Sequence, residues 1–102
     1  MTTAKFIKKN GNHTVRISGH ADYSHPDIVC AAVSMLTCTL AAALNKRKGF
    51  FANIKKGKAY IKVPCSNAAD AAVDTVKTGM FLLAEHYPKN VVLKEEGYAE
   101  NN

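Results

Sequence analysis

The sequence predicts an α+β fold, a two-layer sandwich in which two helices pack on a mostly antiparallel sheet. Short alternating segments separated by turn residues predict strands, and two long apolar segments predict helices. Their order along the chain is β-β-α-β-β-α-β. Because 102 residues are enough for one core and not for two, we expect a single domain over residues 1–96 and a flexible tail over 97–102.

The first two strands are predicted at residues 3–8 and 13–18. In the second, Val15 and Ile17 alternate with polar residues, which is typical of a strand with one buried face. Asn-Gly between the strands supplies the positive φ values that a tight hairpin turn requires. The pair is therefore expected to form a hairpin, and Gly19 ends it.

The first long helix is expected to run from Asp27, its N-cap, to about Asn45. Residues 28–44 carry no charge, and the apolar side chains lie nearly all round the helix. The segment is at the short limit for a membrane span and is rich in Ala, Thr and Ser, so a buried helix is favoured over a membrane helix. A helix with so little polar surface needs cover on two sides, and a second copy of the chain is the expected second cover.

A second hairpin is predicted at residues 50–54 and 59–63, turned by Lys55-Lys56-Gly57-Lys58. A second helix follows, with Asn67 and Asp70 in an arrangement like a capping box. Residues 91–94 are expected to be the last strand.

Composition indicates a soluble globular protein that has 47% apolar and 22% charged residues. The chain has 14 lysine and arginine residues and 8 aspartate and glutamate residues, and many of the lysines lie in or near the second predicted hairpin. A solvated face explains this surplus, and weak contact with ribosomal RNA is the alternative. The three cysteines form no CxxC pair, and no apolar leader precedes the first strand. These features predict a cytoplasmic protein with free thiols.

The candidate catalytic residues are His20 and Cys30. If Asp27 is the N-cap, Cys30 is the third residue of the helix, where free backbone N–H groups and the helix dipole stabilise a thiolate. The same N–H groups could bind a developing oxyanion. His20 ends the neighbouring strand and could reach the sulfur as general base and then as general acid.

Other interpretations of these residues stay open. A cysteine in an apolar helix is most often packing, as expected for Cys38. A zinc site from His20, His25 and Cys30 lacks a fourth ligand, so no metal or cofactor is expected. Asp22 or Asp27 could orient the imidazole, but Asp27 needs no role beyond capping, and His25 is a weaker candidate base. His13 is expected to be a surface residue or one whose hydrogen bonds are satisfied, and Cys65 is expected to be structural or incidental.

The residues Gly19-His20-Ala21 and the run from Asp27 to Ser34, Asp-Ile-Val-Cys-Ala-Ala-Val-Ser, resemble the motif of the ribosomal-processing cysteine protease family Prp, also described as YsxB-like. The resemblance implies a catalytic dyad at His20 and Cys30, with Asp27 and Ser34 as further motif positions. It also implies a homodimer and a loop that closes over the bound peptide. The family's loop is usually longer, and Pro26 is expected to stiffen it here.

The resemblance further implies the substrate. Bacterial members of the family remove an N-terminal extension from large-subunit ribosomal protein twenty-seven, cutting after paired aromatic residues. Tyr23, Met35 and Phe50 are expected to line the pocket for these side chains. The main alternative is a non-enzymatic ribosome- or RNA-associated α/β protein that uses the lysine-rich hairpin. A thiol-dependent redox or transferase enzyme is a third hypothesis, weakened by the lack of an evident resolving cysteine.

Overall fold

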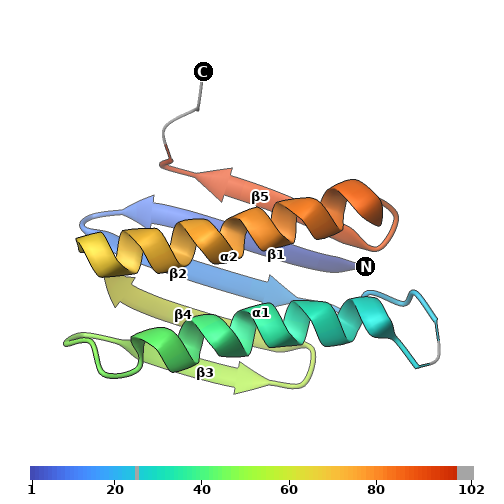
Figure 1. Ribbon diagram of the computed structural model, residues 1–102, viewed down its shortest axis with the longest axis horizontal. Helices are drawn as coiled ribbons and strands as arrows, with labels where there is room; N and C mark the ends of the chain where they lie inside the picture. The colour runs from blue at the N-terminus through green and yellow to red at the C-terminus, as the bar shows by residue number, and fades with distance from the viewer. Residues whose placement is uncertain (25, 99–102) are drawn as a thin grey trace.

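The computed structural model describes residues 1–24 and 26–98 of the chain. Two helices lie on one face of a five-stranded sheet, side by side and along the strands (Figure 1). The predicted α+β sandwich and element order are confirmed. In chain order the elements are β1 (Thr2–Lys9), β2 (Asn12–Ser18), α1 (Ile28–Leu44), β3 (Phe51–Lys55), β4 (Lys58–Pro64), α2 (Asn67–His86) and β5 (Val91–Glu96).

The strands lie in the order β3-β4-β2-β1-β5. Strand β1 pairs with β5 in parallel, whereas β1–β2, β2–β4 and β3–β4 are antiparallel, as the sequence predicts for most of the sheet. The parallel pair arises because β5 returns from α2 to the free edge of β1. The two hairpins therefore meet in the middle of the sheet, where β2 pairs with β4.

The core lies between the sheet and the helices. Alternate residues of each central strand point inward, and Ala4, Phe6, Val15 and Ile61 are almost fully buried. The helices approach each other closely at Gly79, where a β-carbon would lie 2.8 Å from a methyl group of Leu36. A small residue at this position lets the two helices pack side by side on one sheet.

Helix α1 begins where the sequence predicts, with Asp27 as its N-cap. Helix α2 does not use Asn67 as its cap: Ser66 is the N-cap, and its hydroxyl oxygen accepts the N–H of Ala69 at 3.1 Å. The prediction was one residue late because Asn and Ser both cap helices well and stand side by side. The carboxylate of Asp70 instead contacts His13.

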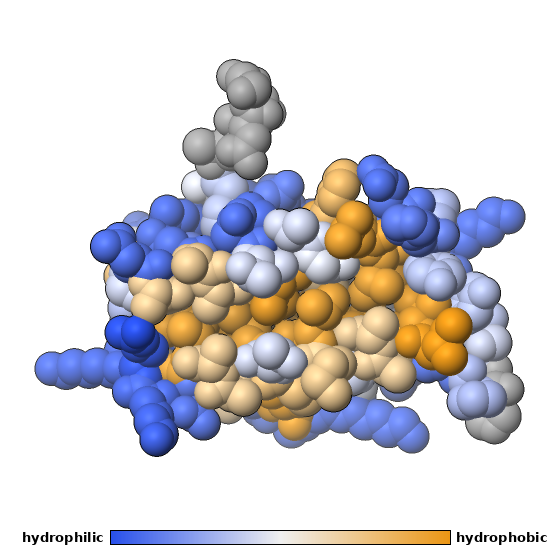
Figure 2. Space-filling view, viewed as in Figure 1, coloured by the Kyte–Doolittle hydropathy of each residue, from blue (hydrophilic) through white to orange (hydrophobic). Residues whose placement is uncertain are grey.

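The outer side of the helix layer is apolar. Figure 2 shows hydrophobic side chains across the centre of this face, with hydrophilic ones around its edge. Ile28 and Met35 of α1 are 57% and 67% exposed, and Phe81 and Leu82 of α2 are each 49% exposed. The sequence correctly predicts that the sheet covers only one side of α1.

Two further findings concern predictions about the chain as a whole. No helix among residues 1–24 and 26–98 is long and apolar enough to cross a membrane. Within the expected tail, Tyr98 bonds through its hydroxyl to a ring nitrogen of His13 at 2.9 Å, whereas 99–102 lie outside the described residues. The flexible tail and the domain limits therefore stay predictions.

Candidate active site

A pocket of about 290 Å³ opens between α1, the end of β2 and the β3–β4 hairpin. His20, Cys30 and Ser34 all line it. Cys30 and Ser34 stand one turn apart on α1, and His20 follows the last residues of β2. The fold thus brings three of the predicted site residues to one cavity, although the sequence places His20 on another element.

Cys30 is the third residue of α1 and is half-buried. Its backbone N–H donates to Asp27 Oδ1 at 2.9 Å. This bond is the main reason why the pKa of Asp27 lies below its ordinary value; the N–H of Tyr23, which donates to Oδ2 at 3.0 Å, adds to the effect. The cap therefore occupies one N–H that the sequence analysis offered to an oxyanion, and the N–H of Cys30 is not free for that role.

His20 is exposed, and its ring lies against the β3–β4 turn. A β-carbon on Gly57 would stand 2.8 Å from Nε2 and 2.9 Å from Cε1 of the imidazole. The backbone supports this approach, because the N–H of Gly19 donates to the carbonyl of Gly57 at 3.0 Å. No local pattern in the sequence indicates that Gly57 contacts His20, because only the β2–β4 pairing brings this turn to the histidine.

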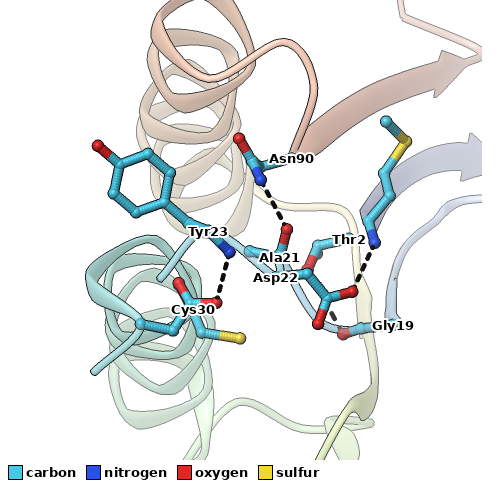
Figure 3. Close-up of polar contacts among 9 residues, drawn as sticks. Thr2, Gly19, Ala21, Asp22, Tyr23, Cys30 and Asn90 are labelled. Carbon is cyan, nitrogen blue, oxygen red and sulfur yellow. Dashed lines mark hydrogen bonds and ion pairs between the residues drawn. The ribbon is translucent and has the colours of Figure 1, made fainter. Parts of the chain in front are cut away.

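The segment between β2 and α1, which carries His20 and leads to Cys30, contacts other parts of the chain at several points (Figure 3). The Thr2 hydroxyl donates to the carbonyl of Gly19 at 3.4 Å, and the Asn90 amide donates to that of Ala21 at 2.9 Å. The ring of Tyr23 meets Tyr87 edge-on, with centroids 5.1 Å apart. Figure 3 also shows the Cys30 sulfur directed from α1 toward the segment of Gly19 and Asp22.

The predicted carboxylates, Asp22 and Asp27, have hydrogen-bond partners other than the imidazole. Asp22 is exposed and pairs with the N-terminal amino group at 3.3 Å. Within residues 1–24 and 26–98, no hydrogen bond joins His20 to a carboxylate, so the structure identifies no third catalytic residue. His25 lies outside the described residues.

Tyr23, Met35 and Phe50, which were expected to line the substrate pocket, are not among the residues that line this cavity. Tyr23 packs on Tyr87, and Met35 is exposed on the outer face of α1. The lining residues include instead Ile17, Val33 and Ile54, together with the lysines of the hairpin turn. Cys38, expected in the core, is exposed and also lines the pocket, because α1 buries only the side that faces the sheet.

A second Cys-His group lies at the other end of the sheet. His13, Cys65 and Asp70 offer ligand atoms within 4.8 Å of one another and could hold a metal ion by residue type. However, the His13 side chain is only 2% exposed. Its Nε2 is hydrogen-bonded to Asp70 at 2.6 Å, and its Nδ1 is hydrogen-bonded to the hydroxyl of Tyr98 at 2.9 Å. Both ring nitrogens of His13 therefore already have hydrogen-bond partners, which fits the expectation of a histidine with satisfied hydrogen bonds.

Among the described residues, His20 and Cys30 are thus a histidine and a cysteine that line one pocket. A family model described as cysteine protease Prp matches residues 1–92. The chain belongs to this family. The resemblance that the motif indicated is therefore confirmed over most of the Prp domain, from β1 to the start of β5.

Solved structures confirm the fold of this Prp family member. The ribosomal processing protease Prp from S. aureus, with a covalently linked product peptide, superposes with a TM-score of 0.75 at 22% identity, covering 93% of this chain and 99% of that one. The protein SMU.848 from Streptococcus mutans has a TM-score of 0.71 at 29% identity, covering 94% and 97%. No match was found among curated proteins.

Proposed function

We propose that this chain is an endopeptidase whose catalytic dyad is His20 and Cys30. Its membership of the Prp cysteine protease family supports a thiol-dependent hydrolase. The observation that carries the assignment of residues is that both side chains line one pocket at the start of α1. In the other cysteine-histidine group of the described residues, His13 and Cys65, both ring nitrogens of the histidine already have hydrogen-bond partners.

In the proposed mechanism, His20 accepts the proton of the Cys30 thiol, and the thiolate attacks the scissile carbonyl carbon. The imidazolium then donates that proton to the leaving amine as the peptide bond breaks and a thioester forms. Water, deprotonated by His20, hydrolyses the thioester and restores the thiol. Asp27 holds the first turn of α1, and so positions the sulfur, through its bond to the N–H of Cys30.

The proposed substrate is the precursor of large-subunit ribosomal protein twenty-seven, cut after paired aromatic residues. The family supports this substrate, and the S. aureus protein is described as a ribosomal processing protease. The apolar side chains of Ile17, Val33 and Ile54 in the pocket walls suit an aromatic side chain of the peptide. We also place the protein in the bacterial cytoplasm, where such a precursor is made.

A peptide with a Phe-Phe-Ala junction tests the proposal. Wild type should cut it after the second phenylalanine, and Cys30→Ala and His20→Ala should lower kcat/KM by a factor of about 10³ or more. Cys65→Ala is the matched control, which removes a half-buried thiol outside the pocket and should retain cleavage. An intact peptide with wild type, or cleavage by Cys30→Ala, would contradict the proposal; rapid peroxide oxidation of Cys30 without cleavage would favour a redox enzyme.

We further propose that the protein is a homodimer that pairs through the apolar outer face of the helix layer. Ile28, Met35, Phe81 and Leu82 are large hydrophobic side chains that the two helices leave exposed. Figure 2 shows hydrophobic side chains across the centre of this face, and a large exposed apolar patch marks an interaction site. Met35→Asp should turn the dimer into a monomer in light scattering. Asn53→Asp, on exposed strand β3, adds the same charge elsewhere and should leave the dimer intact.

The alternative function is a non-enzymatic RNA-associated protein that uses the hairpin lysines. Lys55, Lys56 and Lys58 line the pocket at the turn, which is where an RNA contact through the turn would lie. In that case affinity for RNA would fall steeply with salt and with loss of these lysines, and Cys30→Ala would have no effect. Peptide cleavage that depends on Cys30 would exclude a purely non-enzymatic role.

A further inference from the structure

One face of the sheet carries both helices, and no other element among residues 1–24 and 26–98 covers the opposite face (Figure 1). The side chains of this open face are the strand residues that alternate with the buried ones. On β1 and β2 they include Lys5 and Arg16, and on β4 and β5 they include Tyr60 and Lys94. The open face is therefore an extended surface, and the strand register shows which of its side chains are neighbours.

Positive charges stand next to one another across this face. In the register, Arg16 is opposite Lys5, and Lys5 is opposite Lys94. Neighbouring strands are about 4.8 Å apart, so three cations from three strands form one continuous row. Like charges directly opposite each other destabilise a sheet. The row therefore weakens the fold unless an anion lies over it.

Negative charges are placed elsewhere. Asp22 and Asp27 are in the loop before α1, and Asp70, Asp74 and Glu85 are on α2. Glu95 pairs with Lys77 of α2 at 2.8 Å, so it lies on the helix side. Among the described strand residues, the open face retains Glu96 alone as an acid, in register with Ile7 at the edge of the sheet.

Aromatic rings continue the row of cations toward β3. Tyr60 is opposite Arg16, whose guanidinium carbon lies 5.5 Å from the centre of the ring. Phe51, which is 55% exposed, lies beside Tyr60 with centroids 6.0 Å apart. Tyr60 is half-buried and Phe51 exposed, and aromatic rings next to a row of cations are what unpaired bases and their phosphates require together.

We propose that the open face of the sheet binds single-stranded RNA. The row of Lys5, Arg16 and Lys94 contacts phosphates, and Tyr60 and Phe51 stack on bases. A single strand is the occupant because the bases of a duplex are paired and cannot reach the rings. This surface lies on the opposite side of the sheet from the pocket, whose walls include the inward-facing Ile17 and Ala59, so it does not depend on the proposed protease function.

Fluorescence anisotropy with a labelled single-stranded RNA of about 12 nucleotides tests the proposal. The triple variant Lys5→Gln, Arg16→Gln, Lys94→Gln should weaken binding and reduce the slope of log Kd against log salt by about 2, since each phosphate contact on a single strand contributes about 0.7. The matched control is Lys46→Gln, Arg47→Gln, Lys48→Gln. It removes the same charges from the exposed segment between α1 and β3 and should retain the slope.

The aromatic half of the site is tested separately. Tyr60→Leu should weaken single-strand binding about tenfold, whereas Tyr60→Phe keeps the stacking ring and should bind as wild type does. Circular dichroism of each variant establishes that it is folded.

Three results would overturn the proposal. The first is equal weakening by both charge triples, which would mean that net charge alone attracts RNA. The second is duplex RNA bound as tightly as the single strand. The third is polyglutamate that binds as tightly as RNA, with an affinity that Tyr60→Leu does not change. That result would mean that the face recognises an acidic protein.

Discussion

The imidazole of His20 lies so close to Gly57 that the turn between β3 and β4 has room for it only because this residue has no side chain. A β-carbon at position 57 would be 2.8 Å from Nε2, and the φ angle of +74° is one that glycine adopts most readily. The two residues are far apart in sequence and meet because β2 pairs with β4. The turn thus lies directly against the candidate catalytic histidine.

Gly57→Ala should lower kcat/KM about 10²-fold, because the new methyl group displaces the imidazole from its place beside the pocket. The control is Gly11→Ala, whose φ of +76° imposes the same backbone strain while a β-carbon there meets nothing within 4 Å. Both variants should lose about 1 kcal/mol of stability in urea unfolding. Equal activity of the two variants would mean that the position of His20 does not depend on Gly57.

Asp27 should act as a helix cap and not as a third catalytic residue. Asp27→Asn retains an oxygen that can accept the N–H of Cys30 and should keep most of the peptidase activity, whereas Asp27→Ala should lose thermal stability and more of the activity. If the carboxylate instead orients His20, both variants would lose about 10²-fold or more in kcat/KM. Peptide kinetics and thermal melts of the two variants separate these outcomes.

The same carboxylate should contribute to stability in acid. The pKa of Asp27 is lower in the folded chain than its usual 3.8, chiefly because the N–H of Cys30 bonds to the ionised form. Its contribution is therefore complete above about pH 4 and is lost as the pH falls through the lowered value. The stability difference between wild type and Asp27→Asn should shrink over that range in urea titrations at successive pH values.

Tyr98 should make the protein sensitive to alkali. Burial raises the pKa of Tyr98 from 10.0 to about 12, helped by negative charge on Cys65, Glu95 and Asp70. Because the raised value belongs to the folded state, the stabilisation is complete below about pH 10 and is lost as the pH rises to about 12. Absorbance at the phenolate band should show this tyrosine ionising after the others, and Tyr98→Phe should remove the late step.

Mutation of His13 and mutation of His20 should have opposite effects on stability and on peptide cleavage. His13→Ala breaks two hydrogen bonds in a side chain that is 2% exposed. It should cost about 2–4 kcal/mol in urea unfolding while the folded fraction still cuts the peptide. His20→Ala should do the reverse, with cleavage lost and stability retained, because His20 is exposed. Loss of cleavage by folded His13→Ala would move the active site to the other end of the sheet.

Local patterns in the sequence were sufficient for the fold class and for the motif. Alternation predicted the strands, the uncharged run from Ile28 to Leu44 predicted α1, and Asp27 marked its start, because these features depend on neighbours a few residues apart. The run from Asp27 to Ser34, with Gly-His-Ala before it, was enough to indicate the Prp family. The strand alternation, the uncharged run and the motif are all properties of short segments, so the sequence alone was sufficient to predict them.

Only the tertiary structure decided what surrounds the candidate dyad. The pairing of β2 with β4 brings Gly57 to His20, and the way α1 faces the sheet leaves Cys38 exposed and Ile54 in the pocket wall. Tyr23, Met35 and Phe50 do not line this cavity for the same reason: no local pattern states which residues from separate elements will meet. Strand register and helix orientation depend on packing across the whole core, and they decide whether two motif residues share one cavity.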